Sequence, residues 1–323
     1  MSLELDFELL EGFERQLDPR HPESGPIPAS VLGYGEITTV FEIGAQDKRQ
    51  VAYKRLPVFR DREELDRYVS SFEEYCRVLT DKVGLELVPY GLASITGKDG
   101  TPVLFLAQEK VEPLSFCHKV IHLLPRDEVL RLVRRILREL ARVWEYNRGG
   151  DRIEMGLDGQ ISNWSVKGFD PSSPSLPDDI ELVYFDTSTP LFRVDGVEQL
   201  DPELFLRGAP SFLVWLIRLL FLEDVMTRYY DLKLVTTDLI ANFFKEQMPE
   251  LIDDLVLLAN DFFAMDAAGL EAPPITVKEV RSYYREDALI WILYLSARKL
   301  DRFLRTRVLR GDYPYILPGK IKR

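Results

Sequence analysis

Short apolar runs separated by polar turns occupy the first part of the chain. Strands are predicted over residues 38–43, 50–55, 85–95 and 102–111, where apolar and β-branched side chains gather between turn-forming residues. Between the two strand pairs, residues 61–81 carry apolar side chains at spacings of three and four, the pattern of an amphipathic helix. This part of the chain therefore predicts a small sheet accompanied by one helix.

Beyond Pro113 the pattern changes to longer helical repeats. Residues 125–146 place apolar side chains on one helix face, residues 151–190 return to short strands and loops, and residues 201–310 are nearly all helical in pattern. We therefore expect an α+β protein with two lobes, a small sheet lobe over residues 1–112 and a larger, mostly helical lobe over residues 113–323.

Composition narrows the classes of function. The 323 residues carry a net charge of −12, which argues against a broad nucleic-acid or anionic-membrane surface. Two isolated cysteines, Cys76 and Cys117, and no zinc-like spacing fit a reducing cytoplasm, and the first residues do not resemble a signal peptide. The most apolar stretch, residues 212–222, is interrupted by Arg218 and is too short to cross a bilayer. We expect a cytoplasmic protein.

A glycine-containing stretch precedes the first predicted strand pair. Gly33 and Gly35 follow a short apolar run and lead into a strand. Glycine permits close approach of the backbone to a phosphate, and also unusual backbone dihedrals. The stretch can therefore cover phosphate groups, although the same pattern also suits a plain hairpin turn.

Lys54 ends the second predicted strand, Val51 to Lys54. A lysine that points inward from such a strand needs an anionic partner, because burying an unpaired ammonium is costly. Phosphate oxygens could supply one, together with a carboxylate from the following helix. Glu73 and Glu74 lie in that helix, and the periodicity leaves the choice between them open.

Three polar residues in the region of short strands suggest a site for phosphoryl transfer. Asp158 and Asn163 are five residues apart, and an apolar strand beginning at Trp164 follows them. Asp186 ends a second apolar strand, Glu181 to Phe185. In that arrangement a carboxylate can accept a hydroxyl proton while an amide and a second carboxylate supply oxygen ligands to Mg²⁺.

Four motifs in fixed order resemble the protein-kinase-like superfamily, and look closest to its aminoglycoside and choline kinase-like phosphotransferases. They are Gly33-Tyr34-Gly35-Glu36-Ile37-Thr38-Thr39-Val40, Val51-Ala52-Tyr53-Lys54, Asp158-Gly159-Gln160-Ile161-Ser162-Asn163 and Val183-Tyr184-Phe185-Asp186. The resemblance spans residues 30–190. It implies a two-lobed kinase-like fold with nucleotide in the cleft between a sheet lobe and a helical lobe.

The resemblance also implies a role for each site residue. Val40 would lie against the adenine, and the backbone of Glu109 and Val111 would meet its edge. Lys54 would hold the phosphates of ATP with the help of Glu73 or Glu74, and Asp158 would act as the base. Asn163 and Asp186 would bind Mg²⁺. The acceptor would be a small molecule held against the helical lobe, and the acidic residues there (Glu223, Asp224 and Asp231 among them) weakly favour a cationic one.

Some residues depart from the family pattern and keep other functions open. Thr38 stands where kinases have a third glycine, Met155-Gly156-Leu157 precedes Asp158 without the usual histidine, and Thr187-Ser188 follows Asp186. A pseudokinase that binds nucleotide without transfer is the principal alternative. A metal-dependent hydrolase that uses Asp158 and Asp186 is another.

A helical interaction protein is the remaining alternative. It would dock a partner through residues 212–217 and the aromatic cluster of Trp291, Tyr294 and Phe303. Such apolar residues at helical spacing are more often core, and an interaction module has no reason to bind ATP and Mg²⁺.

Overall fold

The computed structural model describes six parts of the chain, residues 3–35, 38–44, 50–207, 227–308, 313 and 315–317. Several features of the sequence lie outside these parts. They are Glu36 and Ile37 of the glycine stretch, most of the connection between the first two predicted strands (residues 45–49), the apolar stretch 212–222, and the acidic pair Glu223 and Asp224.

A five-stranded antiparallel sheet forms the small lobe, with the strand order β1-β2-β3-β5-β4. Its strands are β1 (Ala29–Tyr34), β2 (Thr39–Ile43), β3 (Val51–Leu56), β4 (Tyr90–Thr96) and β5 (Pro102–Glu109). The sheet thus contains the four predicted strands, with β4 beginning at Tyr90 rather than at Leu85, and adds β1 at its edge.

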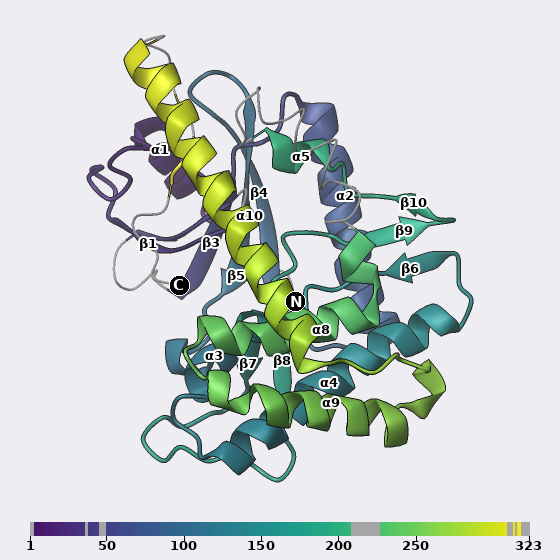
Figure 1. Cartoon of the computed structure of the whole chain (residues 1–323). Coiled ribbons are helices and arrows are strands. Elements are labelled where there is room, and N and C mark those ends of the chain that lie inside the picture. The colour runs from purple at the N-terminus through teal and green to yellow at the C-terminus, as the bar shows by residue number, and fades with distance from the viewer. Residues whose placement is uncertain are drawn as a thin grey trace.

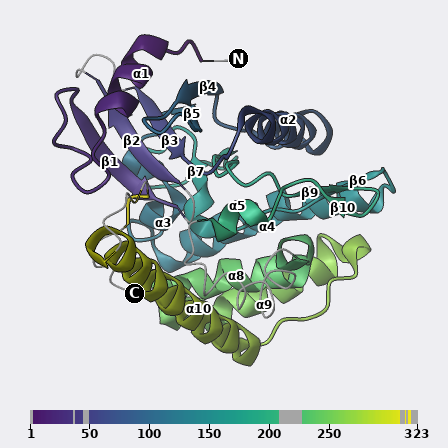
Figure 2. The ribbon, with the colours of Figure 1, turned by 90° about the horizontal axis from the view of Figure 1, so that it is seen from above.

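The two faces of this sheet are covered by different helices, α1 (Phe7–Gln16) and α2 (Arg62–Val78), which lie on opposite sides of it (Figure 2). Successive side chains of a strand point to opposite faces. Phe105 accordingly packs with α1, whereas Leu104 and Leu106 pack in the core that includes α2. Lys54 and Gln108 share the parity of the α2 side, so they face the large lobe.

The chain leaves the small lobe after Glu109 and builds a larger region, which is mostly helical and lies below the sheet in Figure 1. Its main helices are α4 (Arg126–Arg148), α8 (Leu232–Lys245), α9 (Ile252–Met265) and α10 (Val277–Phe303). Short helices accompany them: η3 (Pro113–Ser115), α3 (Cys117–Val120), α5 (Glu203–Leu206), η5 (Arg228–Tyr230), η6 (Pro249–Leu251) and η7 (Ala268–Leu270). Two π-helical turns, η2 (Leu79–Val83) and η8 (Leu304–Val308), extend α2 and α10.

Two small sheets sit between the large helices and the five-stranded sheet. One is the antiparallel pair of β7 (Trp164–Val166) and β8 (Leu182–Tyr184), and β7 directly follows the turn η4 (Ile161–Asn163). The other joins β6 (Ile153–Met155), β9 (Phe192–Val194) and β10 (Val197–Glu198). An isolated bridge between Leu87 and Tyr184 ties the chain before β4 to β8. The predicted site residues of the large lobe flank these short strands.

The α+β prediction is confirmed: a small antiparallel sheet lobe with α2 beside it precedes a larger helical region. The sequence pattern missed α1 as a cover for the outer face of the sheet. Within the described residues, no helix is both long enough and apolar enough to span a membrane.

Candidate functional site

Lys54 lies at the centre of the site, on the face of β3 that meets the large lobe. Its side chain is largely buried, and Nζ lies 3.0 Å from Oδ1 of Asp186. The same ammonium donates to the carbonyl oxygen of Phe185 at 3.3 Å. The ion pair offsets the cost of burying the charge, and it joins the small lobe to the end of β8.

The helix carboxylate that the sequence suggested as the partner of Lys54 takes no part in this pair. Glu74 pairs instead with Arg77 at 2.6 Å, and Glu73 is exposed. The inward face of α2 carries Phe72 and Cys76, both almost fully buried, and Glu73 points about 100° away from Phe72 around the helix. The expectation that Glu73 or Glu74 pairs with Lys54 is therefore corrected, because the phase of α2 turns both carboxylates away.

Asp186 follows β8 and receives two polar contacts on one oxygen. Besides Lys54, the hydroxyl of Ser188 donates to Oδ1 at 3.0 Å. Burial raises the pKa of the Asp186 carboxyl, but the Lys54 charge and these hydrogen bonds outweigh it, so the net pKa lies below the usual value. Asp186 therefore carries a negative charge at neutral pH, as a metal ligand must.

Asp158 lies in the connection between β6 and η4, and its Oδ1 accepts from the backbone N–H of Gln160 at 3.2 Å. Burial, followed by the charges of Asp238 and Asp186, raises the pKa of Asp158 to about 7. A carboxylate with such a pKa can accept a proton near neutral pH, which suits a general base.

Asp238 supports the Asp158 connection from α8. Its side chain is 4% exposed and accepts from Asn242 Nδ2 at 3.3 Å, while Asn242 Oδ1 accepts from the backbone N–H of Ile161 at 3.1 Å. Burial raises the pKa of Asp238 as well. The sequence analysis missed this residue; its only signal was an acidic residue within the apolar run Leu234 to Phe243.

Asn163 and Asp186 are brought together by the pairing of β7 with β8. Trp164 pairs with Tyr184, and the backbone N–H of Phe185 donates to the carbonyl oxygen of Asn163 at 3.2 Å. The side-chain Nδ2 of Asn163 donates to the Asp158 carbonyl oxygen at 3.2 Å. These bonds place the two predicted metal ligands at the same end of the hairpin and tie them to Asp158.

The donor set suits Mg²⁺ better than a transition metal. Among the described residues, no cluster of three or more His, Cys, Asp or Glu has the arrangement of a metal site. Mg²⁺ is commonly held by one or two protein oxygens and completes its shell with water and phosphate oxygens. The Asp186 carboxylate and the Asn163 amide oxygen fit that requirement.

The two glycines lie at the end of β1, Gly33 within the strand and Gly35 just after it. Gly35 N–H donates to the Thr38 carbonyl oxygen at 3.0 Å, and Gly33 pairs with Val40, whose other neighbour across the sheet is Lys54. A Cβ on Gly35 would lie 2.4 Å from the Thr38 hydroxyl oxygen, whereas one on Gly33 would meet nothing. A side chain at position 35 would therefore require the Thr38 hydroxyl to move, and β2, which begins at Thr39, pairs with the strand of Lys54.

The segment after β5 is the predicted contact for adenine. Glu109 N–H donates to the Pro89 carbonyl oxygen at 3.1 Å, and Lys110 N–H donates to the Gln50 carbonyl oxygen at 2.9 Å. No backbone acceptor is found for Val111 N–H within the part of the chain that the structure describes. The backbone N–H groups of Glu109 and Lys110 are thus used within the protein, which leaves Val111 as the residue of this segment that we retain as the predicted adenine contact.

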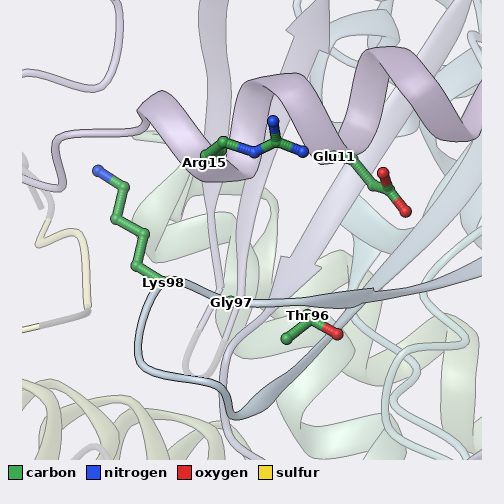
Figure 3. A pocket seen from close by; sticks show the side chains of 5 residues that line it. All are labelled: Glu11, Arg15, Thr96, Gly97 and Lys98. Atoms are coloured by element: carbon green, nitrogen blue, oxygen red, sulfur yellow. The ribbon is translucent and has the colours of Figure 1, made fainter.

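A cavity of about 350 Å³ lies elsewhere, on the α1 side of the small lobe (Figure 3). Glu11 and Arg15 of α1 face Thr96, Gly97 and Lys98 of the turn between β4 and β5 there. It contains none of the predicted site residues and opens on the sheet face opposite Lys54, so we assign it no part in the site.

Comparison with known proteins gives a family match and remote likenesses to solved structures, among them the two that follow. Residues 20–302 match the sequence model of a family described as a family of unknown function, DUF6206. No curated protein matches. WaaP in complex with acyl carrier protein is similar with a TM-score of 0.34 and 12% identity, covering 80% of this chain and 90% of that chain. An apo pseudokinase is similar with a TM-score of 0.28 and 12% identity, covering 71% and 90%.

Proposed function

This chain belongs to the family DUF6206, and we propose that it is an ATP- and Mg²⁺-dependent phosphotransferase of kinase-like type that acts on a hydroxyl group of a small molecule. The observation that carries the proposal is the convergence of Lys54, Asp158, Asn163 and Asp186. They come from separate stretches of the chain, yet hydrogen bonds and strand pairing join them around one centre.

Each residue has a role that its surroundings support. The ammonium of Lys54 now pairs with the Asp186 carboxylate. With that carboxylate bound to Mg²⁺, Lys54 would pair with the phosphates instead. Asp186 and Asn163 would hold Mg²⁺, which neutralises charge on the phosphate oxygens. The glycine turn next to Lys54 would cover the phosphates, with Val40 and the Val111 amide beside the adenine.

Asp158 would act on the acceptor. Its carboxylate would take the proton of the acceptor hydroxyl while the acceptor oxygen bonds to the γ-phosphorus and the bond from that phosphorus to the bridging oxygen breaks, releasing ADP. The raised pKa of Asp158, about 7, favours this role. A cationic acceptor remains the preferred class on the ground of the acidic residues of the helical lobe, Asp231 among them.

The alternative is a pseudokinase that binds nucleotide without transferring phosphate. Two observations favour it: Thr187 and Ser188 follow Asp186, and no glutamate of α2 contacts Lys54. The two functions share the nucleotide site and differ in the use of Asp158.

Turnover of ATP by the wild type and by Asp158→Asn separates these functions. The assay measures ADP formation with Mg²⁺ and a panel of amine and sugar alcohols, and ATP binding is measured in parallel. The phosphotransferase predicts turnover that falls by about 10²-fold or more in Asp158→Asn, with ATP affinity retained. Full activity of Asp158→Asn would show that the base is misassigned. Binding without turnover in the wild type would support the pseudokinase.

A further inference from the structure

The segment from Phe185 to Ser188, which includes Asp186, is held from the small lobe at several points. Lys54 of β3 contacts Phe185 O and Asp186, as described above. Gln108 of β5 donates from Nε2 to the same Phe185 carbonyl oxygen at 2.8 Å. Tyr68 of α2 donates its hydroxyl to the Ser188 carbonyl oxygen at 2.7 Å. Three elements of the small lobe, β3, β5 and α2, thus form hydrogen bonds with one short segment of the large lobe.

Both added donors are buried. Gln108 is 5% exposed and Tyr68 is 4% exposed, so neither hydrogen bond can be replaced by bulk water without opening the interface. Burial also raises the pKa of the Tyr68 phenol, which keeps its hydroxyl protonated as a donor. Thr187, which lies between the two acceptor residues, is contacted as well. Gln108 Nε2 lies 3.5 Å from Thr187 Oγ1, and the Cys76 thiol of α2 hydrogen-bonds Thr187.

The contacts of Tyr68 and Gln108 fall on backbone carbonyls on either side of Asp186. Fixing Phe185 O and Ser188 O limits rotation of the chain between them, and it is that chain which aims the Asp186 carboxylate. Glu73 and Glu74 of α2 turn away from Lys54, so α2 is linked to this segment by the Tyr68 hydroxyl on the Ser188 carbonyl oxygen and by the Cys76 thiol on Thr187. A shift of α2 would therefore move the chain that carries Asp186, even if the contact between Lys54 and Asp186 were unchanged.

We propose that Tyr68 and Gln108 are positioning residues for Asp186, and that through them the small lobe sets the affinity of the site for Mg²⁺. The part of this inference that concerns Mg²⁺ rests on the proposed function. The part that concerns the position of the segment rests only on the observed hydrogen bonds. Neither residue touches the reacting atoms. Loss of either hydrogen bond should loosen the Asp186 carboxylate and weaken metal binding, while leaving metal-free nucleotide binding at Lys54 largely intact.

The variants are Tyr68→Phe and Gln108→Met, which remove the donors and keep the volume. Tyr75→Phe is the matched control. Tyr75 also lies in α2, is fully buried, and donates its hydroxyl to a backbone carbonyl, that of Gly156 at 3.1 Å. Its other hydrogen bond is to the side chain of Tyr184 in β8, so neither contact falls on the segment from Phe185 to Ser188. It therefore reports the general cost of losing a buried phenol hydroxyl from this helix.

The first measurement is the Mg²⁺ concentration at half-maximal thermal shift with ATP held constant. We expect it to rise about tenfold in Tyr68→Phe and in Gln108→Met, the effect of one hydrogen bond, and to stay within about twofold of wild type in Tyr75→Phe. The shift produced by ATP without Mg²⁺ should change little in any variant.

The second measurement is amide hydrogen exchange of a peptide spanning residues 185–190 in the protein without nucleotide. Faster exchange in Tyr68→Phe and Gln108→Met, but not in Tyr75→Phe, is the expected result. Unchanged exchange together with an unchanged Mg²⁺ midpoint would overturn the proposal. If the wild type showed no Mg²⁺-dependent response, the proposed function and the metal role would both fall, and the exchange data alone would decide whether the segment is held.

Discussion

Lys54 and Asp186 neutralise each other at a position where neither charge could be buried alone. The pair is 3.0 Å long, with the lysine side chain 11% exposed and the aspartate side chain 31% exposed. In the proposed site, the more exposed carboxylate is the group that a metal would approach from solvent. The ion pair holds both charges when no ligand is bound, and Mg²⁺ with phosphate oxygens would replace it charge for charge.

The carboxyl of Asp158 gives the pH dependence of the proposed reaction. A general base works only when unprotonated, so kcat/KM should rise about tenfold per pH unit below 7 and level off above about pH 7. Asp238→Asn removes a neighbouring charge that raises this pKa and keeps the hydrogen bond from Asn242. The midpoint of the profile should then move to lower pH. A profile that Asp238→Asn leaves unmoved would contradict this account of the base.

The sequence identified some site residues and missed others for a physical reason. Lys54, Asp158, Asn163 and Asp186 each stand at a fixed place relative to an apolar strand, so local pattern finds them. Gln108 and Tyr68 reach partners 77 and 120 residues away, and only the packing of the two lobes brings those partners near. No local pattern carries that information.

At the scale of elements, Gly35 after β1 and Thr38 before β2 lie close together in space. The Thr38 hydroxyl occupies the place that a side chain on residue 35 would need. In kinase-like proteins a third glycine is usual where this chain has Thr38, so the two positions are coupled here in a way that the general pattern does not show.

Substitutions at Gly35 and Thr38 test that coupling. Gly35→Ala should displace Thr38 and weaken ATP binding about tenfold, because the new Cβ would lie 2.4 Å from Thr38 Oγ1. The double variant Gly35→Ala with Thr38→Ala removes the obstructing oxygen and should recover most of the affinity. Gly33→Ala, which meets open space, is the control. Calorimetric titration with ATP measures all four proteins, and equal losses in the single and double variants would rule out the steric explanation.

The sequence predicted the helix α2 but not the direction in which its polar side chains point. Its apolar stripe was recognised, and the glutamates beside that stripe were expected to reach Lys54. One residue of helical advance separates Phe72 from Glu73, and about 100° of rotation is enough to carry a carboxylate out of the interface. A hydrophobic pattern predicts well which apolar residues are buried. It predicts less well which of the neighbouring polar side chains points inward.

At the scale of the whole molecule, the five-stranded sheet separates two cores, and β3 carries an ion pair on each face of the sheet. On the large-lobe face the contact is Lys54 with Asp186. On the α1 face, Arg55 donates from Nε and Nη2 to the two carboxylate oxygens of Glu14, each at 2.6 Å, and both side chains are buried. Consecutive residues of β3 thus anchor the sheet to α1 on one face and to the large lobe on the other.

Removing one partner of the Arg55–Glu14 pair should destabilise the small lobe strongly. Glu14→Ala leaves the guanidinium buried without its carboxylate, and such a loss typically costs about 3–5 kcal/mol. Glu8→Ala, an exposed position on the same helix, should cost less than about 0.5 kcal/mol. Urea unfolding measures both. A Glu14→Ala variant as stable as Glu8→Ala would show that α1 is not fixed to the sheet by this pair.

The central claim, a nucleotide site built on Lys54 and Asp186, is tested most directly by thermal-shift titration with ATP, with and without Mg²⁺. Wild type is compared with Lys54→Met and with Lys167→Met, whose lysine lies on the surface of the large lobe and pairs with Glu86. A ligand that binds only the folded protein raises the unfolding midpoint. We predict a Mg²⁺-dependent rise in wild type and Lys167→Met that is lost in Lys54→Met. No rise in the wild type, or an equal rise in all three proteins, would contradict the account.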